Sequence, residues 1–387
     1  MPALRITFAL LLLTPAVAVD RRSAPEDLVA HEWGTFTSVA GEDGRPVQWA
    51  PLSGPADLPC FVDRLSPYSP KSRLSGLVRM ETPVIYFYSQ RPVTLSVRVQ
   101  FPQGWITEWF PRASKVAPGS WSAPAVPASY RNGQIEWQSV DVLPGENPKF
   151  PSSKGASHYY AARDTDSAPL RIDKQWEKLI FYRGIGDFEV PVRPAFTGAG
   201  KLKIRNTGSE TIPLAILFEN RQGKLGYRVT RGIKDEVEME PPELVGTLDH
   251  LRQELVNDLV EFGLFRREAL AMVETWRDSW FEEGMRLFYL VPRSQVDSVL
   301  PLTIAPMPAS TARVFVGRVE ILSSPVRETI QTGLTGGDIQ PLMKLGRFLS
   351  PFVAQIQRTH GNVYFPYLQH ANNELLQRQF STPACVE

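Results

Sequence analysis

Short stretches in which apolar and polar residues alternate dominate residues 27–230, and this period predicts β-strands. The clearest stretches are VAHEWGTFTSV (29–39), PVIYFY (83–88), VTLSVRVQF (93–101) and TIPLAILFEN (211–220). Turn-forming residues separate such stretches at 90–92, at 132–133 and at 221–224. Short strands joined by such turns predict a β-sandwich-like region with antiparallel sheets.

The segment 112–170 departs from this alternation. It is rich in proline, and aromatic residues such as Trp137 and Tyr159 are interspersed with the prolines. This composition favours long ordered loops between strands rather than a linker. Functional side chains are often found on loops that a rigid sheet positions.

The period becomes helical near Pro242. Apolar residues then recur every three or four positions in two stripes, which predict a helical hairpin over 241–284. Strand-like sequence returns over 285–323, and 324–387 is predicted to be a helical tail. The predicted fold class is therefore α+β and predominantly β, with sandwich-type antiparallel sheets, a helical hairpin insertion and a helical C-terminal tail.

The first residues predict export from the cytosol. Arg5 precedes a short apolar core, and Ala16–Ala18 has the small-x-small pattern of a cleavage site, so 1–18 is predicted to be a signal peptide. The alternative is an N-terminal membrane tether. The apolar core is shorter than the roughly 20 residues that span a bilayer, and no later run reaches that length. We expect a periplasmic or extracellular protein with no integral membrane segment after cleavage.

Charge and composition exclude some functions. The chain has 387 residues, with 43% hydrophobic residues and a formal net charge of +1 from 42 Lys and Arg against 41 Asp and Glu. Such a composition is typical of globular proteins. Removal of Arg5 with the signal peptide would leave a neutral chain, so a nucleic-acid partner is not expected.

Two cysteines, Cys60 and Cys385, are present. Export would allow a disulfide between them, and the alternative is two unrelated buried thiols. Neither a CxxC pair nor an HExxH motif occurs, so the sequence indicates no specific cofactor. A metal site that uses His31 and His158 is an alternative hypothesis.

HEWGTFT (31–37) is the most unusual string. On a strand, His31 and Trp33 share one face, whereas Glu32 lies on the other face. Glu32 is a candidate catalytic acid. The alternative is that His31 and Glu32 are hydrogen-bonded structural residues at the rim of the sheet.

GWITEWF (104–110) places Trp105 and Trp109 on one face and Glu108 on the other. If Glu108 faces apolar side chains, burial would raise its pKa, as a general acid requires. The two indole rings would then form an exposed platform that stacks on sugar rings. In the alternative, the tryptophans face the core and Glu108 is solvated.

HYYAARDTD (158–166) collects polar groups in a predicted loop. His158 and Asp166 are candidate catalytic bases, and Arg163 is a candidate anchor for a carboxylate or phosphate. Arg183, at a predicted strand end, is expected to point into the same cleft. The alternative is a loop held by an internal Arg–Asp pair.

Six strings together carry a resemblance: HEWGTFT (31–37), METPVIYFY (80–88), HYYAARDTD (158–166), FYRG (181–184), TWRDSWFEEG (275–284) and RVFVGRVE (313–320). The chain resembles a family of uncharacterised exported bacterial proteins that carry HEWGTFT near the mature N-terminus. The resemblance implies export and one unit of constant length. It implies no activity, ligand or catalytic residue.

Two functional hypotheses follow. In the first, a loop-built cleft binds, and as an enzyme hydrolyses, a polar polymer such as a glycan, with Glu108 or Glu32 as acid and His158 or Asp166 as base. In the second, the protein is non-catalytic and binds a cell-envelope protein through a β face and the helical hairpin.

Overall fold

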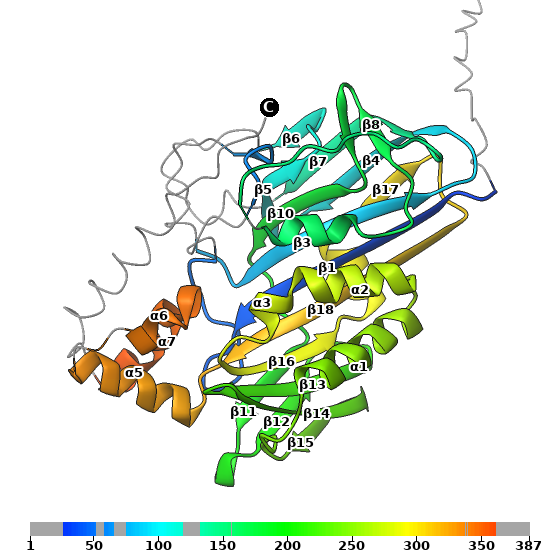
Figure 1. Cartoon of the computed structure of the whole chain (residues 1–387). Coiled ribbons are helices and arrows are strands. Elements are labelled where there is room, and N and C mark those ends of the chain that lie inside the picture. Colours follow the sequence, from blue (N-terminus) through cyan, green and yellow to red (C-terminus); the bar gives the residue numbers. More distant parts are fainter. Residues whose placement is uncertain are drawn as a thin grey trace, which may run out of the picture.

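The fold is α+β and predominantly β, with several antiparallel sheets and a few helices (Figure 1). The structure is a computed structural model that describes residues 26–51, 58–65, 75–118, 132–155, 157–336, 338 and 340–360. The predicted signal peptide at 1–18 and the end of the predicted tail, from 361, lie outside the described residues.

A nine-stranded sheet forms the centre of the molecule. Its order is β14 (Lys224–Ile233), β13 (Ile212–Arg221), β16 (Gly284–Leu290), β18 (Ser310–Ile321), β1 (Val29–Val39), β3 (Val78–Tyr88), β10 (Ile180–Gly186), β5 (Gly104–Phe110) and β2 (Asp63–Arg64).

Two smaller sheets accompany the large one. The six-stranded sheet contains β17 (Leu302–Ala305), β4 (Val93–Phe101), β7 (Gly133–Val142), β8 (Leu170–Ile172) and β9 (Gln175–Glu177), and β6 (Lys115–Ala117) pairs with β7. The three-stranded sheet contains β11 (Val192–Phe196), β12 (Leu202–Asn206) and β15 (Glu236–Met239). Apolar side chains of both pack in one core with the nine-stranded sheet.

The opposite face of the nine-stranded sheet is covered by helices (Figure 1). They are α1 (Leu248–Glu261), α2 (Arg266–Thr275), α3 (Arg277–Trp280) and the 3-10 helix η3 (His158–Arg163), which packs on α2. Beyond one end of β1 lie α5 (Ser324–Gly336), α6 (Gln340–Met343), η5 (Gly346–Phe348) and α7 (Leu349–His360). Short elements α4 (Arg293–Val299) and η4 (Gly198–Gly200) complete the described chain.

Strands β1 and β3 are buried along almost their whole length. Side chains on one face of β1 meet the smaller sheets, and those on the other face meet the helices. A strand covered on both faces does not need strict alternation, because both of its faces are inside the protein. The polar residues of HEWGTFT are therefore buried, rather than lying at an exposed rim.

Two pairs of consecutive strands are not hairpins, although the sequence predicts a turn between the first pair. β3 and β4 flank the turn at 90–92, but they belong to different sheets. β12 and β13 are likewise split between the three-stranded and nine-stranded sheets. Burial explains the split for β3 and β4, since β3 is buried on both faces whereas β4 alternates between buried and accessible positions. The nine-stranded sheet also contains one parallel pair, β1 with β18.

Candidate functional site

A cavity of about 410 Å³ opens on the helix-covered side of the nine-stranded sheet. Strands β3 and β18 form its floor, α3 and the start of η3 form two sides, and residues 343–348 form the remaining wall. We call it the polar cavity; among its lining residues are Glu81, His158, Trp276, Glu282, Arg318 and Arg347.

The floor of the polar cavity is ionic. Arg318 of β18 is 2% exposed, and its Nη2 donates to Glu282 at 2.7 Å while its Nε donates to Glu320 at 2.6 Å. Burial alone would lower the pKa of Arg318, but Glu320 and Glu282 raise it above its ordinary value. Arg318 is therefore a permanent cation.

The same network continues into neighbouring strands. Arg286 of β16 donates from Nε to Glu320 at 2.9 Å. On β3, Nε of Arg79 lies 3.1 Å from a carboxylate oxygen of Glu81. Loss of one member of such a buried network leaves an uncompensated charge, so these pairs hold one another in place.

The α3 side of the cavity presents an indole, a hydroxyl and a carboxyl. Trp276 is 4% exposed and stacks on Trp280 with ring centroids 6.2 Å apart. Among the described residues, Nε1 of Trp276 and Oγ of Ser279 have no hydrogen-bond partner. Buried polar atoms without a protein partner commonly bind water or a ligand. Burial raises the pKa of Glu282, although Arg318 and Arg286 act against this shift.

The wall formed by residues 343–348 supplies two cations. Nη1 of Arg347 lies 3.4 Å from Glu81, and Nζ of Lys344 lies 3.7 Å from Glu283. Phe348 fixes this wall, because its ring lies 5.0 Å from the Arg318 guanidinium carbon and stacks on Trp49 at 5.5 Å.

An ion pair between Arg163 of η3 and Glu177 holds Ser157 and His158 at the cavity. Nε and Nη2 of Arg163 donate to the buried carboxylate of Glu177 at 2.9 and 2.6 Å. Tyr159 donates to the same carboxylate at 2.9 Å. The guanidinium carbon of Arg163 also lies within 6 Å of four aromatic rings, those of Phe61, Phe150, Tyr159 and Tyr160. Arg163 thus positions η3 and does not line the polar cavity, and its role as a ligand anchor stays a prediction.

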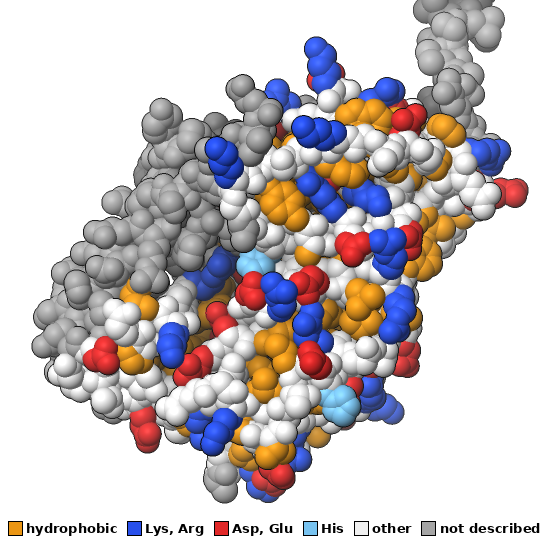
Figure 2. All heavy atoms as spheres, in the orientation of Figure 1, with side chains coloured by type: hydrophobic (Ala, Val, Ile, Leu, Met, Phe, Trp, Pro, Cys, Tyr) orange, Lys and Arg blue, Asp and Glu red, His pale blue; other side chains and the backbone are white. Residues whose placement is uncertain are grey.

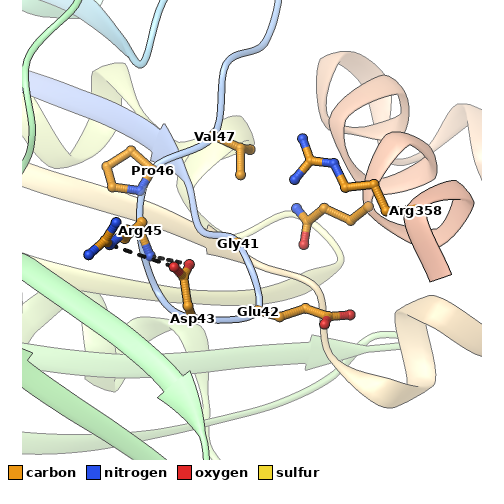
Figure 3. Close-up of a pocket in the computed structure, with 8 residues that line it drawn as sticks. Gly41, Glu42, Asp43, Arg45, Pro46, Val47 and Arg358 are labelled. Atoms are coloured by element: carbon orange, nitrogen blue, oxygen red, sulfur yellow. Dashed lines mark hydrogen bonds and ion pairs between the residues drawn. The ribbon is translucent and has the colours of Figure 1, made fainter.

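Two further cavities lie elsewhere in the described structure. One, of about 370 Å³, lies between residues 41–47 and α7 (Figure 3). Arg45 and Asp43 pair with each other there, and the amide of Gln355 donates to the carbonyl of Ala40. Another cavity, of about 330 Å³, is lined by Tyr88 and Asp166 with loop residues.

Glu32 is part of a structural ion pair. It is fully buried, accepts a hydrogen bond from Nε of Arg313 at 2.5 Å and another from Tyr182. It lies on the face of β1 that packs against the smaller sheets, opposite the polar cavity, and Glu32 does not line that cavity. The alternative interpretation, a satisfied structural carboxylate, describes its environment.

The residues of GWITEWF lie in β5, and none of them lines the polar cavity. Trp105 is 3% exposed and donates from Nε1 to the carbonyl of Pro118. Trp109 is half-buried against the core, so the predicted exposed platform is wrong. Glu108 accepts a hydrogen bond from Thr107, and its register partner on β10 is Arg183. Both Glu108 and Arg183 are buried within the sheet.

His31 and Asp166 have other partners. Nδ1 of His31 lies 2.7 Å from Oε2 of the fully buried Glu268 on α2. Asp166 is exposed and pairs with Arg267 at 2.5 Å. His31 does not line the polar cavity that His158 borders. Within the described part of the chain, no group of three His, Cys, Asp or Glu side chains is placed to hold a metal ion.

Cys60 is half-buried and disulfide-bonded. Cys385, the other cysteine of the chain, lies outside the described residues, so the Cys60–Cys385 pairing stays a prediction.

Sequence reasoning missed Glu81, Glu282, Arg318 and Arg347 as cavity residues. A signal for two of them exists: Arg79-Met80-Glu81 and Arg318-Val319-Glu320 place charges two residues apart in otherwise apolar strands. Such a pair lies on one face of a strand, where two isolated charges would be costly to bury.

The helix-covered face carries acidic and basic side chains side by side (Figure 2). Apolar side chains are also exposed on the helical hairpin, namely Val260, Phe262, Phe265 and Leu270. In the described segments, no helix has the length and apolar character that crossing a bilayer demands.

Comparisons with known proteins give little guidance. No family model and no curated protein matches the chain. Among solved structures, the chain is similar to the yeast delta-COP-I mu-homology domain complexed with a Dsl1 WxWxV peptide, with 7% identity over 76% of this chain and 98% of that chain. The TM-score of 0.27 is too low to support a common fold.

Proposed function

We propose that the protein binds a polar polymer, such as a glycan, and that one or two of its units enter the polar cavity. The observation that carries the proposal is convergence. Glu81, His158, Trp276 and Arg318 come from four distant segments of the sequence and line one cavity. Its volume of about 410 Å³ falls in the range of roughly 300 to 1,000 Å³ typical of ligand sites.

The lining groups suit hydroxyl-rich ligands. A sugar hydroxyl both donates and accepts hydrogen bonds, so its recognition needs acceptors and donors side by side. Glu81 and Glu282 supply carboxyl acceptors, while Ser279 and the guanidinium of Arg347 supply donors. Trp276 adds an indole whose N–H is free to bond among the described residues.

Four of the strings that carry the family resemblance contribute to this cavity. METPVIYFY supplies Glu81, HYYAARDTD supplies His158, TWRDSWFEEG supplies Trp276 and Glu282, and RVFVGRVE supplies Arg318. The strings RVFVGRVE, HEWGTFT, METPVIYFY and FYRG lie on β18, β1, β3 and β10, which are consecutive strands of the nine-stranded sheet. This placement supports the proposal that the strings serve one site in an exported protein.

The hydrolytic form of the proposal uses a different acid from the one expected. Glu108 and Glu32 lie outside the cavity, whereas Glu282 lines it and has a raised pKa because it is buried. A raised pKa keeps a carboxyl protonated closer to neutral pH, as a general acid requires. Glu81 is the second carboxyl of the cavity, and cleavage of a glycosidic bond uses two.

A saccharide-binding panel tests the proposal. We expect the wild-type chain to bind at least one oligosaccharide, and Trp276→Phe, which keeps an aromatic ring but removes the N–H donor, to weaken that binding by about tenfold. Trp176→Phe is the matched control, because Trp176 lies on β9 and does not line the cavity. Equal loss in both variants, or no binder in a broad panel, would contradict the proposal. Release of reducing ends that Glu282→Gln abolishes would establish the hydrolytic form.

A further inference from the structure

Among the described residues, the ion pairs around the polar cavity join five cations to four carboxylates. The cations of the network are Arg79, Arg286, Arg318, Lys344 and Arg347, and their carboxylate partners are Glu81, Glu282, Glu283 and Glu320. Within these ion pairs of the described residues, the cations exceed the carboxylates by one.

The excess is located at one wall. Glu81 is shared between Arg79 at 3.1 Å and Arg347 at 3.4 Å, so the shorter contact belongs to Arg79. A guanidinium has five N–H donors, and the structure gives Arg347 this one long contact among the described residues. Lys344 is still less engaged, since its side chain is 66% exposed and lies 3.7 Å from Glu283.

Neutral donors also line the cavity. Nε1 of Trp276 and Oγ of Ser279 have no partner among the described residues, and both side chains line the cavity. Trp276 is more than nine-tenths buried, so its N–H gains little from bulk water. An oxygen-rich anion would satisfy these donors and neutralise the excess charge together.

We propose that the ligand unit in the polar cavity carries a compact oxyanion, a carboxylate or a sulfate, which Arg347 and Lys344 bind. This inference rests on the proposed function and narrows the polymer to an acidic one. Arg347 holds the anion through paired N–H donors, and Lys344 contributes as a point charge. The carboxyls of Glu81 and Glu282 remain available for the hydroxyls of the same unit.

Calorimetry with matched saccharides tests the inference. The probes are an oligogalacturonate, its methyl ester, which has the same polymer backbone without the charge, and a sulfated galactose oligomer. We expect the acid or the sulfate to bind at least about tenfold more tightly than the ester, since hydrogen bonds to charged groups are the stronger ones. Preference for the acid over the sulfate, or the reverse, identifies the oxyanion.

Variants separate this inference from the parent proposal. Arg347→Gln should weaken binding of the acidic probe by about tenfold, and Lys344→Gln by about threefold. Lys344 is exposed, so its substitution tests the inference even if Arg347→Gln disturbs the wall. Arg277→Gln is the control, because Arg277 lies on α3 next to the cavity and does not line it.

Each outcome decides the matter. Equal affinity for ester and acid overturns the inference and leaves the glycan proposal standing. Acid-selective binding that neither Arg347→Gln nor Lys344→Gln weakens also overturns it. Failure of every saccharide to bind overturns both. Acid- or sulfate-selective binding that both variants weaken and the control preserves supports the inference.

Discussion

At the scale of single residues, Glu282 combines two properties that rarely occur together. Its carboxyl is buried enough to have a raised pKa, yet 30% of its side chain stays accessible at the cavity. Arg318 at 2.7 Å pulls the pKa down, but burial outweighs this attraction. The folded state therefore favours the protonated form more than the unfolded state does.

This shift predicts a pH-dependent stability. Below its ordinary pKa of 4.5, Glu282 is protonated in both the folded and the unfolded state, and its contribution to the free energy of unfolding is fully present. This contribution is lost as the pH rises through the pKa of the folded state. Gln is neutral throughout, so the unfolding free energy of Glu282→Gln minus that of the wild type should increase as the pH rises from 4.5 through the folded pKa. Urea unfolding measures it.

Asp141 serves as the control for this prediction, because its pKa shifts in the opposite direction to that of Glu282. Burial raises the pKa of Asp141, but hydrogen bonds from Thr94 and Arg171 lower it further, below 3.8. Asp141 therefore stabilises the fold above pH 3.8, and this contribution is lost as the pH falls through the folded pKa. A Glu282→Gln difference that is flat with pH would contradict the assignment.

At the scale of elements, η3 shows how a short segment acquires a fixed position. Six residues cannot hold a helix by themselves, because the nucleation cost exceeds the gain from a few hydrogen bonds. The Arg163–Glu177 pair fastens η3 to β9, and aromatic rings surround the guanidinium. His158 reaches the polar cavity because η3 is fastened in this way.

We predict that Glu177→Gln lowers the unfolding free energy by about 3 kcal/mol, because it leaves the Arg163 charge buried without its partner. Arg171→Gln, which breaks the exposed pair with Asp141, should cost less than about 1 kcal/mol. Denaturant unfolding compares the two, and the ring resonances of His158 report whether η3 moves. Equal losses of unfolding free energy would show that the Arg163–Glu177 pair is no stronger than a surface pair.

The positions of the strands and helices could be predicted from the sequence better than the pairing of the strands in sheets. Alternation located β1, β3, β4 and β13, and the helical period located α1 and α2. The pattern could not tell which sheet a strand joins, because β3 and β4 are adjacent in sequence and yet lie in different sheets. Burial on both faces of β1 and β3 also hid which face of HEWGTFT and METPVIYFY meets the helices.

At the scale of the whole molecule, the polar cavity depends on two separately built parts. Its floor belongs to the nine-stranded sheet, and one wall belongs to the C-terminal helical segment. An apolar cluster joins the parts, with Val39 and Trp49 on one side and residues such as Phe348 and Phe352 on the other. Sequence reasoning expected the helical tail but not its role as a wall, because the contacts span about 300 residues and leave no local pattern.

Phe348→Ala should loosen this junction. The loss of a buried phenylalanine costs about 3 kcal/mol, and here it also removes the ring beside Arg318. We expect limited proteolysis to cut within α5–α7 faster than in the wild type, while the strands stay protected. Phe196→Ala, at a residue that is 39% exposed, is the control. Faster cleavage throughout the chain would instead indicate that the two parts unfold as one.

The origin of the cavity wall has a consequence for biogenesis. Ribosomes release β1 and β3 first, whereas residues 343–348 emerge hundreds of residues later. Every described strand of the three sheets thus precedes this wall in the sequence. Ligand binding at the polar cavity, as proposed above, would require the part of the described chain that is made last.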